Sequence, residues 1–95
     1  MPTYVLLSRI EPDLTGDAGS FRRIAETVRQ TIRAECPEVT WKESFVTFGR
    51  FDVLDIFEAP NEVEAQKVAL IIRRHARTQT ETMQAMRWQD FLDNL

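Results

Sequence analysis

TFGRFDVLDIFEAP, residues 47–60, is the stretch that decides the fold. Two apolar runs flank Gly49 and Arg50, as in two strands joined by a tight turn. We expect a two-residue type II′ turn with positive φ at Gly49, because glycine reaches that region without a Cβ clash. Pro60 ends the second strand, since proline has no N–H to donate to a sheet.

The rest of the chain supplies two helices and two further strands. We expect strands at residues 3–10, 39–48, 51–59 and 77–86, helices at about 21–35 and 62–75, a loop at 11–20 and a short helical turn at 88–95. Ser20 is expected to cap the first helix, and Asn61 with Glu64 to form a capping box on the second. The order β-α-β-β-α-β predicts one α+β domain over residues 1–95, a ferredoxin-like four-stranded antiparallel sheet with both helices on one face.

The strands carry apolar residues on both sides. The expected pairs of sides are Tyr4, Leu6 and Ile10 against Val5 and Leu7, Trp41 and Phe45 against Val46 and Phe48, and Phe51, Val53 and Phe57 against Leu54 and Ile56. Two helices cover only one face, and an uncovered apolar face of this size marks an interface. We therefore expect a homodimer or higher homo-oligomer, packed sheet to sheet as a dimeric α/β barrel.

Composition limits the classes of function. The chain has 95 residues and a formal net charge of −3, which argues against binding nucleic acid through a basic face. The apolar runs are too short to span a membrane, and the first ten residues lack a signal-peptide pattern. Cys36 is the single cysteine, so no internal disulfide forms, and a reducing cytoplasm is the expected location.

Two carboxylates occupy the apolar strand of the opening stretch. Asp52 lies near its start, where a carboxylate can accept hydrogen bonds from turn amides or a neighbouring hydroxyl. Asp55 is more central, and a lone carboxylate among apolar groups has a raised pKa that suits a general base or a ligand contact. The alternative for Asp55 is an ion pair with Arg9, Lys42 or a residue of the dimer partner.

His75 is the only histidine and lies near the end of the second helix. It is either a capping or packing residue or a catalytic base. His75 and Cys36 do not stand at metal-ligand spacing, so we expect no metal site. The sequence has no phosphate-binding glycine loop, and we expect no cofactor. Cys36 precedes Pro37 at a helix end and is expected to be a partly buried thiol, with a nucleophilic role only if a neighbour depresses its pKa.

Large apolar side chains mark where a small molecule could bind between helices and sheet or near the dimer seam. The candidate walls of such a site are Tyr4, Trp41, Phe45, Phe57 and Met83. Ordinary core packing is the alternative for each of them.

Three stretches resemble the GYD-domain family: MPTYVLLSRI, GRFDVLDIFEAPNEVEA and RTQTETMQAM. The matching positions are Gly49, Phe51, Asp52, Glu58, Ala59, Pro60, Arg77, Thr80, Glu81 and Thr82. Phe51 replaces the tyrosine usual in the family, and residues 11–36 match poorly. The resemblance implies the dimeric α/β-barrel superfamily, whose members include cofactor-free monooxygenases, isomerases, haem enzymes and amino-acid-sensing domains.

Three functions follow as hypotheses. The first is a dimeric protein that binds a small molecule or supports an oligomeric assembly. The second is a cofactor-independent oxygenase or isomerase that uses Asp52, Asp55 or His75 as its base. The third is a ligand-sensing regulatory module. A titratable group in a pocket open to solvent would favour the enzyme.

Overall fold

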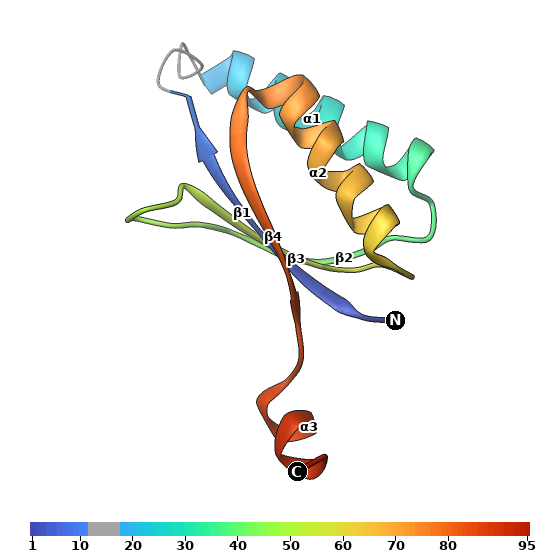
Figure 1. Ribbon diagram of the computed structural model, residues 1–95. Coiled ribbons are helices and arrows are strands. Elements are labelled where there is room, and N and C mark those ends of the chain that lie inside the picture. The colour runs from blue at the N-terminus through green and yellow to red at the C-terminus, as the bar shows by residue number, and fades with distance from the viewer. Residues whose placement is uncertain (12–17) are drawn as a thin grey trace.

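The computed structural model describes residues 1–11 and 18–95. Its elements are β1 (Thr3–Ile10), α1 (Ala18–Glu35), β2 (Thr40–Val46), β3 (Val53–Glu58), α2 (Glu62–Ala76), β4 (Thr78–Ala85) and α3 (Trp88–Asp93) (Figure 1). Residues 12–17, which make up most of the expected loop, lie outside the described residues. The predicted α+β order of elements is confirmed.

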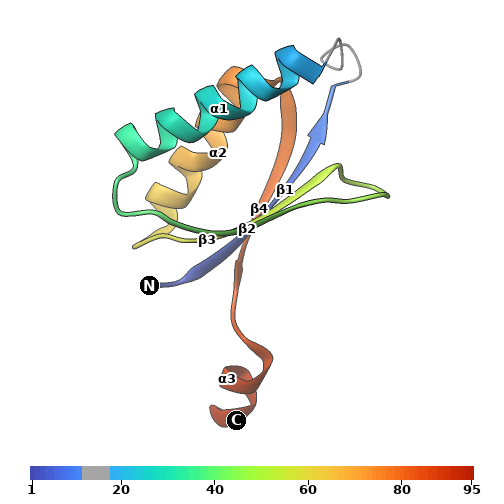
Figure 2. The same cartoon turned by 180° about the vertical axis from the view of Figure 1, so that it is seen from behind.

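The four strands form one antiparallel sheet in the order β2-β3-β1-β4. The central strand β1 pairs with β3 on one side and with β4 on the other, and Leu6 lies opposite both Asp55 and Thr82. Helices α1 and α2 lie together on one face of the sheet, whereas α3 stands away from it (Figures 1 and 2). The result is the expected ferredoxin-like arrangement.

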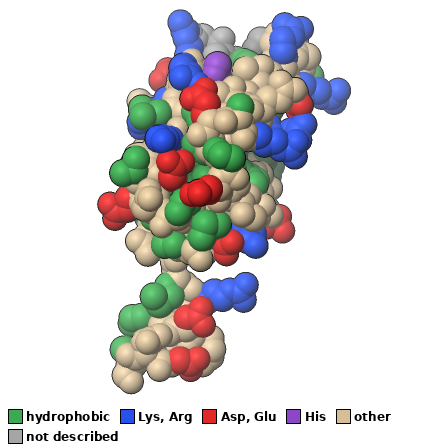
Figure 3. All heavy atoms as spheres, turned by 90° about the vertical axis from the view of Figure 1, so that its right-hand side faces the viewer, with side chains coloured by type: hydrophobic (Ala, Val, Ile, Leu, Met, Phe, Trp, Pro, Cys, Tyr) green, Lys and Arg blue, Asp and Glu red, His purple; other side chains and the backbone are tan. Residues whose placement is uncertain are grey.

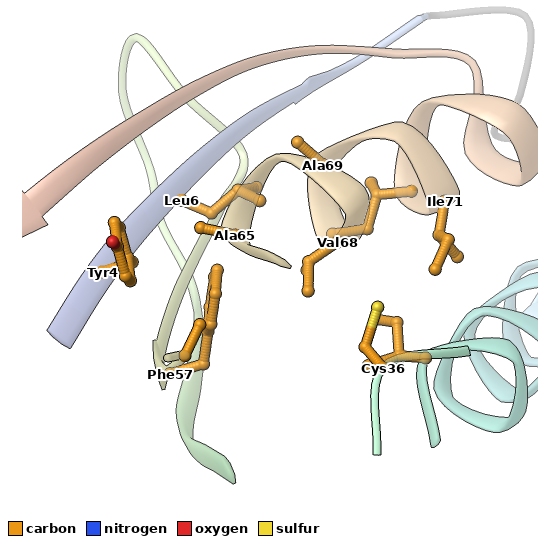
Figure 4. Close-up of a cluster of buried hydrophobic side chains, with 11 residues drawn as sticks. Tyr4, Leu6, Cys36, Phe57, Ala65, Val68, Ala69 and Ile71 are labelled. Atoms are coloured by element: carbon orange, nitrogen blue, oxygen red, sulfur yellow. The ribbon is translucent and has the colours of Figure 1, made fainter. Parts of the chain in front are cut away.

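The core lies between α2 and the helix-facing side of the sheet, and the end of α1 completes it (Figure 4). Its buried side chains are Tyr4, Leu6, Ile32, Cys36, Phe57, Ala59, Ala65, Val68, Ala69, Ile71 and Ile72. Small residues at Ala65 and Ala69 let the backbone of α2 approach the strands, and Phe57 fills the space beside them with no exposed surface. Tyr4, Leu6 and Phe57 therefore face the helices, as their alternation predicts.

Helix α1 uses only part of its expected apolar stripe. The stripe comprises Phe21, Ile24, Ala25, Val28 and Ile32. Only Ile32 is fully buried and Val28 packs against the core, whereas Phe21 is 41% exposed. Because α1 packs chiefly on α2 and not on the strands, its first turns reach beyond the core.

The helix ends agree with the sequence in one case of two. Asn61 caps α2, and its side-chain oxygen accepts a hydrogen bond from the backbone N–H of Glu64 at 3.0 Å. The Glu64 carboxylate pairs with Lys67 at 2.9 Å, so the reciprocal half of the capping box is replaced by an ion pair. Ser20 is not an N-cap, because α1 already begins at Ala18. Arg77 ends α2 in the left-handed region, with φ of 42°.

The expected two-residue turn is wrong. Residues 47–52 join β2 to β3, and Gly49 does not have positive φ. The connection closes through Thr47, whose backbone N–H donates to the carbonyl of Asp52 at 2.9 Å and whose hydroxyl donates to the carbonyl of Phe51. A wider loop closed by threonine needs no left-handed glycine.

A bulge in β2 changes which side of the sheet the later side chains of that strand occupy, so part of the expected arrangement is wrong. The pairing with β3 shifts between Trp41 and Glu43, so Trp41 lies opposite Phe57 while Phe45 lies opposite Leu54. One extra residue reverses the side on which all later side chains stand. Trp41 therefore faces the helices and Phe45 faces the opposite side of the sheet.

That opposite side, which we call the open face, is apolar at its centre. Its apolar members are Val5, Leu7, Phe45, Leu54, Ile56 and Met83. Phe45 is 51% and Met83 is 49% exposed, and none of the described helices packs on this face (Figures 1 and 2). The expectation of a second, uncovered apolar face thus holds for the single chain.

Candidate functional site

Asp55 stands at the centre of the helix-facing side of the sheet. It lies between Leu6 on β1 and Ser44 on β2, and only 7% of it is exposed. The Ser44 hydroxyl donates a hydrogen bond of 2.6 Å to Asp55 Oδ1, and Trp41 Nε1 donates one of 2.8 Å to Ser44 Oγ. A chain of hydrogen bonds therefore links the exposed edge strand to a carboxylate in the interior.

Burial raises the pKa of Asp55 above its usual value, and the hydrogen bond from Ser44 partly opposes the shift. Among the described residues no cation pairs with Asp55. Arg9 donates to the carbonyl of Arg50, and Lys42 pairs with Glu58 at 3.6 Å. The expected ion pair with Arg9 or Lys42 is therefore wrong, because Arg9 stands on the open face and Lys42 lies in the bulge.

Three aromatic rings form a row beside Asp55. Phe57 stacks on Trp41 with ring centroids 5.2 Å apart and on Tyr4 with centroids 5.9 Å apart. We call Tyr4, Phe57 and Trp41 the aromatic row. Trp41 is 38% exposed, so the row runs from solvent at β2 into the core. Phe57 lies between the other two rings and has no exposed surface, so Trp41 is the member of the row that offers a ring face to a planar or cationic group.

The other two expected walls, Phe45 and Met83, lie elsewhere. Both stand on the open face, on the far side of the sheet from Asp55. They cannot line one site with the aromatic row. The bulge in β2 explains Phe45, because alternation counted without it places Phe45 beside Trp41.

Ser8 is a buried polar residue that was not among those expected from the sequence. It is 3% exposed, and its hydroxyl finds no hydrogen-bond partner among the described residues. Ser8 follows Leu6 by two residues on β1, so it stands on the same face as Asp55 and diagonal to it. The alternation of Tyr4 and Leu6 predicts a third apolar side chain at position 8, so the serine found there is the feature of the sequence that could have indicated a buried hydroxyl.

Asp52 has a structural position. Its Oδ2 accepts a hydrogen bond of 2.8 Å from the backbone N–H of Ile10, and its own N–H donates to the carbonyl of Ser8 at 2.8 Å. The carboxylate thus ties the loop before β3 to the end of β1. Its donor is an amide of the neighbouring strand, in place of the expected turn amide or hydroxyl.

His75 and Cys36 do not join Asp55. His75 is half-buried in the last turn of α2, where Arg74 Nε donates to its Nε2 at 3.4 Å. Burial, and then the charge of Glu64, raise the pKa of the Cys36 thiol, which keeps it protonated and unreactive. In the part of the chain that the structure describes, no three acidic, histidine or cysteine side chains cluster to hold a metal ion.

The fold and the site together define a ferredoxin-like α+β protein with a buried carboxylate on the helix-facing side of its sheet. The chain belongs to the GYD-domain family, since the family model for the GYD domain matches residues 4–95. The resemblance noted from the sequence is thereby confirmed. A search among curated proteins found no match. No described helix has both the length and the apolar character needed to cross a membrane.

Solved structures support the fold. The crystal structure of FFRP-DM1 is 26% identical with a TM-score of 0.56, and the match covers 90% of this chain and 100% of that one. The hypothetical protein PHS023 from Pyrococcus horikoshii is 26% identical with a TM-score of 0.55, over 92% of each chain. TTHA0845 from Thermus thermophilus is 21% identical with a TM-score of 0.53, over 92% of this chain and 95% of that one, and shows the fold alone.

Proposed function

We propose that this chain is a homodimeric protein that binds a small molecule at Asp55. The ligand is an apolar molecule with one strong hydrogen-bond donor, and a protonated amine is the donor that fits best. The observation that carries the proposal is a carboxylate that is 7% exposed and has no cation beside it among the described residues. Desolvating such a group costs free energy, which a bound cation offsets.

The aromatic row supports the same class of ligand. Trp41 and Phe57 stack almost parallel, with an angle of 9° between their rings. An ammonium group near the exposed ring face of Trp41 gains a cation–π contact, and the body of an aromatic amine gains apolar contact with the same ring. Ser8 adds a buried hydroxyl diagonal to the carboxylate. Groups of this kind favour a small amphipathic molecule over a bare ion.

A ligand can approach Asp55 over β2, which is an edge strand of the sheet. Residues on the helix-facing side of β2 remain exposed, with Trp41 at 38% and Val46 at 71%. Asp55 lies one strand further in and connects to that edge through Ser44. A ligand that enters over β2 therefore meets the aromatic row first and the carboxylate next.

The dimer rests on the open face. Its half-exposed residues Phe45 and Met83 surround the partly buried centre formed by Leu7 and Leu54. A second copy packed sheet to sheet buries the same apolar set on both chains, as a two-fold interface requires. We also propose a cytoplasmic location, which is supported by the one free and buried thiol at Cys36.

The ligand site is tested by thermal unfolding with three matched probes. Benzylamine is expected to raise the melting temperature, whereas benzyl alcohol raises it less and benzoate does not. Saturation at one hundred times the dissociation constant contributes about 2.7 kcal/mol, or roughly 10 °C or more for a domain of this size. Asp55→Asn should abolish the benzylamine shift and Asp93→Asn, on exposed α3, should keep it. An equal shift in wild type and Asp55→Asn contradicts the proposal.

The dimer is tested by light scattering across micromolar concentrations. The wild-type chain should have twice the 11.1 kDa mass of one chain. Phe45→Lys, on the open face, should shift the protein to monomer. Leu70→Lys is the matched control, because Leu70 is 56% exposed on α2. A monomeric wild type refutes the dimer.

Catalysis by Asp55 is the second candidate, since its raised pKa suits a general base. Proton transfer in an oxygenase or isomerase commonly uses a further acid or donor group. In the described residues neither Asp52 nor His75 hydrogen-bonds or pairs with Asp55. We therefore place binding, including a ligand-sensing role, before catalysis.

A further inference from the structure

Residues 86–95, which we call the α3 arm, lie outside the body of the molecule. Every residue of the arm is exposed. The arm extends from the end of β4 away from the sheet and from both larger helices (Figures 1 and 2). In the space-filling view only a narrow connection joins it to the body (Figure 3). The chain's own core therefore does not cover it.

The arm has one apolar side and one polar side. Trp88, Phe91, Leu92 and Leu95 recur at the spacing of a single helical stripe, and they are 71%, 46%, 40% and 85% exposed. The rings of Trp88 and Phe91 contact each other, with centroids 5.9 Å apart. The other side is acidic, with Asp90 and Asp93. Such a stripe is typical of a helix that packs on another surface.

Helix α3 is too short to be stable alone. It has six residues, and Arg87 at its N-cap makes no side-chain capping bond. Backbone hydrogen bonds of the arm run within it, from the Phe91 N–H to Arg87 and from the Leu95 N–H to Leu92. Isolated helices shorter than about 12–15 residues are marginal in water. A partner surface that buries the apolar stripe would supply the missing stabilisation.

A second copy of this chain is placed to be that partner, and here the inference rests on the proposed dimer. Met83 and Ala85 of β4 stand on the open face, and the arm continues directly from them. Ala85 lies level with Thr3, at the end of the sheet opposite residues 47–52. A two-fold axis that lies in the interface and runs diagonally to the strands carries the partner's 47–52 loop, which lies at the β2 edge, to the base of the arm at the β4 edge.

The loop and the arm are complementary. Phe48 of the partner is 97% exposed and offers an apolar surface two residues before the basic Arg50. We propose that the apolar stripe of each arm packs on Phe48 of a second copy. The acidic side of the arm carries a charge opposite to that of Arg50 in this loop. Each chain both gives and receives one arm, so the two contacts close symmetrically.

Disulfide trapping between two single-substitution chains tests the contact. Full-length Phe48→Cys and Leu92→Cys chains are mixed, oxidised and analysed without reductant. We expect a covalent heterodimer several-fold above that from a Val63→Cys and Leu92→Cys mixture, because Val63 is also accessible, at 65%, but lies on α2. Cys36 is buried and stays in all chains. A yield no higher than the control overturns the inference.

Dimer affinity provides the second measurement. Phe91→Asp should raise the dissociation constant of the dimer by at least about tenfold, as loss of a buried aromatic anchor does. Leu70→Asp should leave it unchanged. A monomeric wild type overturns both the dimer and the arm contact. A wild-type dimer whose affinity Phe91→Asp does not alter overturns the arm contact alone.

Discussion

Replacing Asp52 by alanine should destabilise the fold through the loss of one hydrogen bond between strands. Asp52 Oδ2 accepts the Ile10 N–H at 2.8 Å, and both residues are half-buried. A hydrogen bond to a charged group is worth about 1.5–3 kcal/mol, and partial exposure favours the lower part of that range, about 1.5–2 kcal/mol. Asp52→Asn keeps a neutral acceptor, so its loss should be smaller, about 0.5–1 kcal/mol.

Urea unfolding at neutral pH measures these free energies. Asp93→Ala is the control, because Asp93 accepts only an exposed hydrogen bond from Gln89 on α3. That variant should lie within about 0.5 kcal/mol of wild type. If Asp52→Ala unfolds at the same urea concentration as Asp93→Ala, the carboxylate does not hold β3 to β1, and a functional role for Asp52 returns.

Three further predictions concern stability. Asp55→Asn should become more stable relative to wild type as pH rises from about 4 to about 7. The pKa of Asp55 is higher in the folded than in the unfolded chain, so the wild-type protein loses stability as the buried carboxyl ionises, whereas the amide does not ionise. A difference between the two urea melts that stays constant with pH would contradict the raised pKa. Phe57→Ala, fully buried, should lose about 3–5 kcal/mol, whereas Val63→Ala, 65% exposed, should lose under about 0.5 kcal/mol; equal losses would place Phe57 outside the core. Gly49→Ala should melt within about 0.5 kcal/mol of wild type, since no atom lies within 4 Å of an added Cβ, and a larger loss would mean a strained turn.

The sequence predicts the sheet well where alternation is regular. Strand β1 has the expected bounds, and Tyr4 and Leu6 face the helices as their spacing indicates. The start of α2 follows from Asn61, a good capping residue before an apolar stripe. These features depend on residues close together in the chain, so local patterns suffice to find them.

The hairpin shows where local patterns fail. The bulge near Trp41 arises from how β2 pairs with β3, and nothing in the residues around it marks the extra position. It reversed the side of Phe45 and so removed Phe45 from the expected site. The loop closes through Thr47 and not through a left-handed glycine, although Gly49 stands where such a turn would need it.

The candidate site was predicted in part. Asp55 stood out because a carboxylate in an apolar strand is unusual. Its neighbours Ser44 and Ser8 did not, since their relation to Asp55 comes from the register of three strands. In the described residues no cation lies beside Asp55, because Arg9 points to the other side of the sheet and donates to the carbonyl of Arg50. Side-chain partners over such distances are set by tertiary structure.

The most direct test of the central claim follows the two indole N–H signals by NMR during titration with benzylamine. Trp41 Nε1 donates into the Asp55 chain through Ser44, whereas Trp88 stands on the exposed arm and serves as the internal reference. Trp88→Phe assigns the signals. We predict that the Trp41 indole signal shifts to saturation, that the Trp88 signal shifts much less, and that Asp55→Asn abolishes the Trp41 shift. An unmoved Trp41 signal, or the same shift in Asp55→Asn, would contradict the claim that Asp55 is a ligand-binding carboxylate.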